Sequence, residues 1–173
     1  MNDAPRIGVG LDSHRMEAGR RCVLGGVEIP SDAGPVGHSD GDALLHAITD
    51  AILGACGEGD IGDLFSPSDP RWKGADSAGF LAEALRRASA RGFRPVSVDT
   101  VVVAERPRLG PWKERIRANL AGMLGLPLDR IGVKAKTAEG LGPIGEGRAI
   151  EAHAVVLLLP IPTSNEQQSR DDE

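Results

Sequence analysis

The sequence predicts one α+β domain, and three observations support this fold class. Segments of alternating or β-branched apolar residues occur near the beginning, in the middle and near the end of the chain. Stretches with apolar residues at helical spacing lie between them. The 173 residues can bury a sizeable core and contain no internal repeat or clear domain boundary. We therefore expect residues 1–160 to form a single domain and the polar residues 161–173 to form a disordered C-terminal tail.

The first predicted strand covers residues 6–12. Its apolar residues Ile7, Val9 and Leu11 alternate with other residue types, which is typical of a half-buried strand. Because residues two apart in an extended chain point to the same side, Asp12 and His14 should extend side by side. A second strand is predicted at residues 21–29.

The first predicted helix runs from about residue 40 to residue 56, with Ser39 or Asp40 as its cap. Its apolar stripe consists of Leu44, Leu45, Ile48, Ala51 and Ile52. Its polar side consists of Asp42, His46, Thr49 and Asp50. A long loop rich in turn-forming residues follows at 59–70, and a loop of this length within a domain is often functional.

The remaining elements alternate between helix and strand. Asp76 or Ser77 can cap a helix that ends near Arg91, and Pro111 suits the first turn of a third helix. The other predicted strands are residues 96–104, 131–136 and 149–159. The last of them is apolar without alternation from Ala154 to Leu159, as expected for a strand covered on both faces. Either a homo-oligomer packed sheet to sheet or a second helical layer of the same chain would provide that cover.

Composition excludes several classes of protein. Cys22 and Cys56 lie far apart and match no C-x-x-C pattern, which argues against a disulfide framework and a cysteine-based zinc site. The net charge of −5 disfavours nucleic acid as a partner. No membrane-spanning run and no targeting segment is recognised, so we expect a soluble, cytoplasmic protein.

Asp12, His14 and His46 form the first candidate site. Catalytic zinc is typically bound by three protein ligands, such as one carboxylate and two imidazoles, with a fourth position left open. Structural zinc usually has four Cys and His ligands. The alternative is that these side chains are ordinary polar groups at a strand end and on a helix face. Spacing along the chain does not decide between the two.

Five motifs together resemble one enzyme family. They are Gly8-x-Gly10-x-Asp12-x-His14, Gly25-Gly26-Val27-x-Ile29-Pro30, His38-Ser39-Asp40-Gly41-Asp42-x-x-x-His46-Ala47-x-Thr49-Asp50-Ala51, Gly59-Asp60-Ile61-Gly62 and Asp69-Pro70-x-Trp72-Lys73-Gly74-Ala75-Asp76-Ser77. In this order and register, from about residue 6 to 159, the chain resembles the 2-C-methyl-D-erythritol 2,4-cyclodiphosphate synthases. The resemblance implies a homotrimer around a central axis, in which each subunit has a four-stranded mixed sheet covered by helices on one face. Active sites would lie between neighbouring subunits.

The resemblance also implies a reaction in non-mevalonate isoprenoid precursor biosynthesis. The substrate 4-diphosphocytidyl-2-C-methyl-D-erythritol 2-phosphate is cyclised, with release of CMP, by a phosphorus-oxygen lyase. By the same resemblance, zinc is held by Asp12, His14 and His46, and magnesium or manganese by Glu139. The implied catalytic residues are His38 and Thr137. The implied substrate-binding residues are Asp12, His14, His38, Ser39, Asp60, Ile61, Gly62, Phe65, Asp69, Ala104, Pro107, Leu109, Gly110, Lys136, Thr137 and Glu139.

The chain departs from the family pattern in three places. The loop from Phe65 to Pro70 has one carboxylate fewer than is usual, and Lys136 stands where a threonine is common. Glu146 occupies the position of an arginine that, in many members, lines an axial cavity for an isoprenoid diphosphate. We therefore expect this cavity to bind isoprenoid diphosphates poorly.

Two other functions remain open from the sequence. A zinc-dependent phosphoester hydrolase would use the same three ligands to activate water, with Asp42, Asp50 or Asp60 as the base. A non-catalytic trimeric scaffold would use the metal only for stability.

Overall fold

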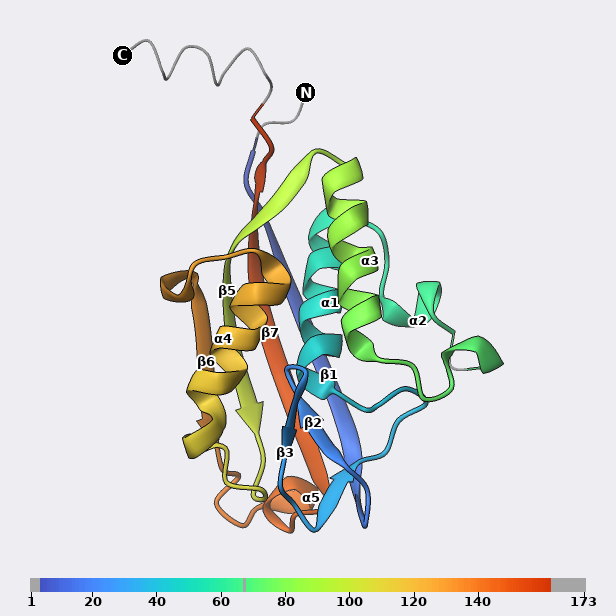
Figure 1. The fold of residues 1–173 in the computed structure, drawn as a ribbon, viewed down its shortest axis with the longest axis vertical. Helices are drawn as coiled ribbons and strands as arrows, with labels where there is room; N and C mark the ends of the chain where they lie inside the picture. The colour runs from blue at the N-terminus through green and yellow to red at the C-terminus, as the bar shows by residue number, and fades with distance from the viewer. Residues whose placement is uncertain (1–3, 67, 163–173) are drawn as a thin grey trace.

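The computed structural model describes residues 4–66 and 68–162 and contains a mixed sheet with helices on one side (Figure 1). The strand order is β4-β1-β7-β5-β6, and only the β5–β6 pair is parallel. The strands are β1 (Arg6–Ala18), β4 (Ala33–Pro35), β5 (Phe93–Val103), β6 (Ile131–Lys136) and β7 (Ala149–Pro160). The α+β class is confirmed, but the expected count of four strands is wrong. The additional strand is β4, whose three residues pair with Met16–Ala18 at the sheet edge.

The helices cover one face of this sheet (Figure 1). The three long helices are α1 (Ala43–Cys56), α3 (Ser77–Ala90) and α4 (Lys113–Leu124), and the short ones are α2 (Ile61–Leu64) and α5 (Gly142–Gly145). Single 3-10 turns occupy Pro70–Trp72, Gly110–Trp112 and Leu128–Arg130. On the opposite face, Ile7 and Val9 of β1 are each 69% exposed in the isolated chain, and Val155 of β7 is 45% exposed. A second helical layer over β7 is therefore ruled out among the described residues.

Two glycines of β1 allow α1 to lie directly against the sheet. A β-carbon at Gly8 would come within 1.7 Å of the Ala51 carbonyl oxygen, and one at Gly10 within 1.9 Å of the Ala47 carbonyl oxygen. No other residue type fits this contact, because any side chain would displace the helix. The two glycines therefore fix the distance between β1 and α1.

A small hairpin replaces the single strand expected at residues 21–29. Its strands are β2 (Cys22–Leu24) and β3 (Val27–Ile29), and they are joined by Gly25 and Gly26 at φ 59° and 70°. Both glycine N–H groups donate to the carboxylate of Asp42, at 2.9 and 2.6 Å. The expectation of one strand fails because a Gly-Gly pair with positive φ closes a two-residue turn.

Asp42 joins this hairpin to α1. Its carboxylate also accepts the N–H of Leu45 at 3.0 Å and so caps α1, where sequence reasoning had placed Ser39 or Asp40. The side chain is fully buried. Burial raises the pKa of Asp42 to about 6, although the backbone N–H groups of Gly26, Leu45 and Gly25 act in the opposite direction.

The remaining boundaries differ by a few residues from expectation. β1 continues to Ala18 instead of ending near residue 12, because β7 pairs with it as far as Arg15. The loop at 59–70 contains α2, whose cap is Asp60. Within the described ranges, none of the helices is long and apolar enough to span a membrane. Of the tail expected at residues 161–173, residues 163–173 lie outside the described residues. Ile161 is described, and its backbone N–H donates to the Gly92 carbonyl at 2.8 Å.

Candidate metal centre and nucleotide cavity

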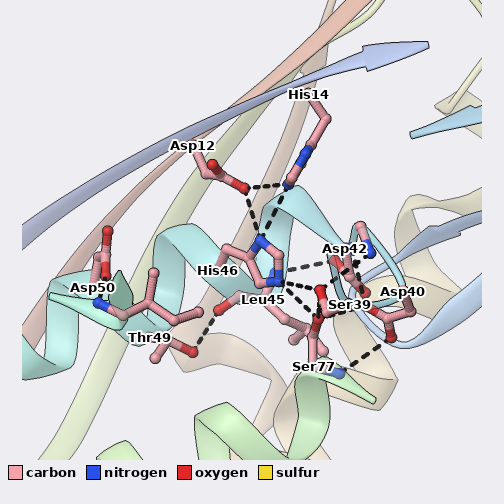
Figure 2. Close-up of polar contacts among 12 residues, drawn as sticks. Asp12, His14, Ser39, Asp40, Asp42, Leu45, His46, Thr49, Asp50 and Ser77 are labelled. Atoms are coloured by element: carbon pink, nitrogen blue, oxygen red, sulfur yellow. Dashed lines mark hydrogen bonds and ion pairs between the residues drawn. The ribbon is translucent and has the colours of Figure 1, made fainter. Parts of the chain in front are cut away.

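Asp12, His14 and His46 converge on one point between β1 and α1 (Figure 2). Asp12 Oδ2 lies 2.8 Å from His14 Nε2 and 2.9 Å from His46 Nδ1, and the two nitrogens are 3.2 Å apart. Asp12 and His14 alternate with exposed residues of β1 and therefore face the helix. His46 is the fourth residue of α1, one position before the residue that touches Gly10.

These three donor atoms fit a zinc ion. Zinc at about 2.0–2.2 Å from nitrogen and carboxylate oxygen in a tetrahedron separates its ligands by about 3.3–3.5 Å. The observed separations of 2.8, 2.9 and 3.2 Å are slightly smaller, so a small outward movement of the side chains would admit the ion. The donor set of one carboxylate and two imidazoles suits zinc and related divalent metals.

Mutual hydrogen bonds determine the charges in this cluster. Burial opposes ionisation of Asp12, but hydrogen bonds from His14 and His46 outweigh it and lower the pKa of Asp12 well below its usual range. Burial likewise opposes protonation of His14, but the hydrogen bond with Asp12 outweighs it, so the pKa of His14 is raised. The Asp12 carboxylate and the His14 imidazole therefore each stabilise the charged form of the other when no metal is bound.

The orientation of His14 is fixed by a backbone carbonyl. His14 Nδ1 donates to the carbonyl oxygen of Val36 at 2.8 Å, and this leaves Nε2 directed at Asp12 and His46. Such an outer hydrogen bond selects the imidazole nitrogen that binds a metal.

A cavity of about 220 Å³ opens beside the cluster. It is lined by Asp12, His14, His38, Ser39, His46, Ile61, Gly62, Phe65, Trp72 and Phe80. The structure thus brings together eight residues that the sequence assigned to the site. Phe65, Trp72 and Phe80 form the apolar wall, with the Phe65 and Phe80 ring centroids 4.4 Å apart.

His38 lies at the edge of this cavity and contacts the 65–70 loop. Its Nε2 donates to the carbonyl oxygen of Asp69 at 3.1 Å, and its own carbonyl accepts the N–H of Gly74 at 2.7 Å. The Asp69 carboxylate is paired with the Arg71 guanidinium at 2.5 Å and also accepts the backbone N–H of Arg71. Asp60 is exposed and caps α2 through the N–H of Asp63.

A second cavity, of about 500 Å³, collects the residues that the sequence assigned to the nucleotide end of the site. Its lining includes Ala104, Leu109, Gly110, Lys136 and Thr137. Three cations, Arg108, Lys113 and Lys136, line it together with one acidic residue, Glu105, so the lining has a net positive charge. The local charge there is therefore opposite in sign to the net charge of the chain.

Glu139 lies beside this second cavity in an unusual backbone conformation. Its φ of 51° makes it the one non-glycine residue with positive φ among the described residues. The Thr137 hydroxyl donates to the Glu139 carboxylate. Strained backbone of this kind often occurs at functional sites. Pro107 lines neither of these two cavities. It lines a third cavity, of about 970 Å³, together with Glu146.

Sequence reasoning missed several contacts. It did not place Trp72 and Phe80 against the metal ligands, although both rings line that cavity. It treated Ser77 only as a possible helix cap, whereas Asp76 is the cap and Ser77 Oγ lies 2.8 Å from His46 Nε2. Trp72 and Ser77 both belong to the motif at residues 69–77, and this shared motif was the sequence signal that could have placed them at the site.

Comparisons with known proteins show the family to which the chain belongs. Residues 5–159 match the model of the YgbB family. The chain is 59% identical to a 2-C-methyl-D-erythritol 2,4-cyclodiphosphate synthase from Gloeobacter violaceus, with 88% of this chain and 94% of that protein covered. It is 53% identical to the synthase of the same name from Solibacter usitatus, with 88% and 96% covered. A solved structure of such a synthase in a CDP-bound form has 49% identity and a TM-score of 0.82, with 88% and 99% covered.

The fold and the cluster define an α+β enzyme with a metal-binding site. The chain belongs to the YgbB family, and the family predicted from the sequence motifs is confirmed. Family membership and the cluster of Asp12, His14 and His46 together imply that the enzyme depends on a metal.

Proposed function

We propose that the chain converts 4-diphosphocytidyl-2-C-methyl-D-erythritol 2-phosphate to 2-C-methyl-D-erythritol 2,4-cyclodiphosphate and CMP. The convergence of Asp12, His14 and His46 beside an apolar cavity, in a chain of this family, is the observation that supports the proposal. An oxygen of the 2-phosphate forms a bond to the β-phosphorus. The bond between that phosphorus and the oxygen bridging to the α-phosphorus breaks, and CMP leaves with the bridging oxygen. The enzyme is on this basis a phosphorus-oxygen lyase.

The protein's part in this reaction is positioning and charge neutralisation. The attacking phosphate is already an anion, so no protein nucleophile is needed, and holding it beside its target supplies effective molarity. Zinc bound by Asp12, His14 and His46, and magnesium or manganese bound near Glu139, would supply Lewis-acid polarisation of phosphate oxygens. His38 and Thr137 would donate hydrogen bonds to phosphate oxygens as charge moves during the transfer.

The substrate would lie between two subunits of a homotrimer. The cavity beside the metal ligands and the cavity beside Thr137 have no lining residue in common. The helix-free face of the sheet carries the exposed apolar side chains Ile7, Val9, Leu11 and Val155. Packing of these faces around a central axis would bury them, and it would supply the second cover expected for β7. A neighbouring subunit would then bring its nucleotide cavity to this metal centre.

The hydrolase alternative has less support. Asp42 is buried and accepts three backbone N–H groups, Asp50 accepts the N–H of Ile61 at 2.7 Å, and Asp60 caps α2. All three candidate bases therefore have structural hydrogen bonds instead of a free carboxylate directed at the open metal position.

Product analysis tests the proposal. The purified protein is loaded with zinc and magnesium and incubated with the cytidylyl substrate, and products are followed by phosphorus NMR. We expect CMP and a cyclic diphosphate in equal amounts. A linear phosphate product would instead identify a hydrolase. Absence of turnover in a trimer that needs zinc for its assembly would identify a scaffold.

A further inference from the structure

The second ring nitrogen of His46 has its own set of partners, away from the other two ligands (Figure 2). His46 Nε2 lies 2.8 Å from Ser77 Oγ and 3.1 Å from Ser39 Oγ. Ser77 is completely buried at the first turn of α3, and His46 is 8% exposed. The contact is therefore shielded from water, where a hydrogen bond is stronger than at the surface.

The direction of the Ser77 hydrogen bond follows from Asp40. The Ser77 hydroxyl is hydrogen-bonded to Asp40 Oδ1. A carboxylate only accepts, so the hydroxyl proton is donated to Asp40. The oxygen of Ser77 is then free to accept, and its partner is the N–H at His46 Nε2.

This chain of hydrogen bonds determines which nitrogen of His46 is left for a metal. In the metal-free protein His46 Nδ1 donates to Asp12. A neutral imidazole carries one proton, so a proton held on Nε2 would leave the lone pair of Nδ1 for an ion bound between Asp12 and His14. We propose that Asp40 and Ser77 are positioning residues that orient His46 and select the tautomer that binds zinc. This inference rests on the metal site of the proposed function and assigns it two further residues.

Asp40 is itself held firmly. It accepts the backbone N–H groups of Asp42 and Ser77, each at 3.1 Å, and its own N–H donates to the Ala75 carbonyl at 3.0 Å. These bonds join the segment before α1 to the segment before α3. The carboxylate therefore has a fixed position from which to orient Ser77, as outer-sphere partners of metal-bound histidines do.

Two substitutions alter the hydrogen bonds between Asp40, Ser77 and His46, and a third changes only the local charge. Asp40→Asn replaces the acceptor-only carboxylate with an amide that can donate to Ser77, which frees the hydroxyl to donate to His46 Nε2 and favours a proton on Nδ1. Ser77→Ala removes the link and leaves the backbone bonds of Asp40 in place. Asp76→Asn is the matched control, because it removes one negative charge at the adjacent position, and asparagine caps a helix as well as aspartate does.

The test measures zinc affinity by competition with a chelator, together with the proton NMR signal of the His46 Nε2–H in the zinc-loaded protein. We expect both Asp40→Asn and Ser77→Ala to weaken zinc binding by about 10–100-fold, and Asp76→Asn to leave it nearly unchanged. The Nε2–H signal should lie downfield and exchange slowly in the wild type, and it should shift or exchange faster in the two variants. The double variant should bind zinc no more weakly than Ser77→Ala alone, because Asp40 acts through Ser77.

Three results would overturn the inference. They are wild-type zinc affinity in Ser77→Ala, an equal loss in Asp76→Asn, or additive losses in the double variant. Unfolding temperatures of the metal-free variants check the fold, and Ser77→Ala alone decides if Asp40→Asn does not fold. Failure of the wild type to bind zinc would instead contradict the proposed metal centre, so the two failures are distinguishable.

Discussion

The backbone of Gly10 in β1 lies directly against the carbonyl of Ala47 in α1, and a β-carbon at Gly10 would come within 1.9 Å of that oxygen. Ala47 follows His46, and Gly10 precedes Asp12 by two residues. The same close approach that packs the helix onto the sheet therefore sets the distance between the metal ligands.

Gly10→Ala should displace α1 and separate His46 from Asp12 and His14. We expect the free energy of unfolding to fall by about 1–3 kcal/mol, the usual range for overpacking, and zinc binding to weaken strongly. Denaturant unfolding and chelator competition measure the two effects. Gly54→Ala is the control, since a β-carbon there meets no atom within 4 Å and alanine favours a helix. Unchanged zinc affinity in Gly10→Ala would show that the close approach does not set the site.

His46→Ala should abolish zinc binding and CMP release together. The apolar residues by which α1 packs are unchanged, so the fold should persist, with a loss of no more than about 3 kcal/mol in the free energy of unfolding. Metal analysis, a CMP-release assay and circular dichroism give the three readouts. Retention of one equivalent of zinc by the variant would remove His46 from the ligand set.

The sequence pattern predicts the direction of the metal-ligand side chains, but it does not predict the contact between β1 and α1. Alternation in β1 correctly placed Asp12 and His14 on one side, and helical periodicity correctly placed His46 on α1. Neither pattern states that the strand and the helix meet. That contact depends on Gly8 and Gly10, whose role appears only when the carbonyls of α1 are in place.

The missed features have local causes. The hairpin of β2 and β3 depends on positive φ at Gly25 and Gly26, which splits one apolar run into two short strands. β4 has no residue pattern of its own, because its three residues pair only at the sheet edge. A serine at the start of a helix usually caps it, but the cap of α3 is Asp76, and the Ser77 side chain contacts His46 of α1.

Thr137→Ala should lower turnover more than it lowers substrate affinity. In the metal-free protein the Thr137 hydroxyl donates to Glu139, and in the proposed reaction it would donate to a phosphate oxygen. Loss of a hydrogen bond that strengthens in the transition state reduces kcat by roughly 10–100-fold with little change in KM. Thr137→Ser keeps the hydroxyl and should retain most of the activity. A raised KM with unchanged kcat would show that the residue only binds substrate.

Glu146 pairs with Arg148 at 2.5 Å and lines the cavity of about 970 Å³. In the proposed trimer, three such carboxylates would approach one axis and repel a diphosphate. Calorimetric titration with farnesyl diphosphate should show no saturable binding, and Glu146→Arg should create it. Saturable binding by the wild type that is abolished by a cavity mutation would contradict the prediction.

The pKa of Asp42 predicts how the stability of the metal-free protein depends on pH. The ordinary pKa of the group is 3.8, and burial among Leu44, Leu45 and the β2–β3 hairpin raises it to about 6 in the folded state. A raised folded pKa means that the folded state binds the proton more tightly than the unfolded state does. The stabilisation is therefore fully present below pH 3.8 and is lost as the pH rises through about 6.

This loss corresponds to about 3 kcal/mol of unfolding free energy between the two pKa values, at about 1.4 kcal/mol for each pH unit. Denaturant unfolding in the presence of a chelator, at a series of pH values from acid to neutral, measures it. Asp42→Asn carries no titrating proton, so its unfolding free energy should be flatter over this range, although it loses one of the backbone N–H contacts of Gly25 and Gly26. If wild type and Asp42→Asn have parallel profiles, another group titrates in this range and the Asp42 carboxylate is ionised throughout.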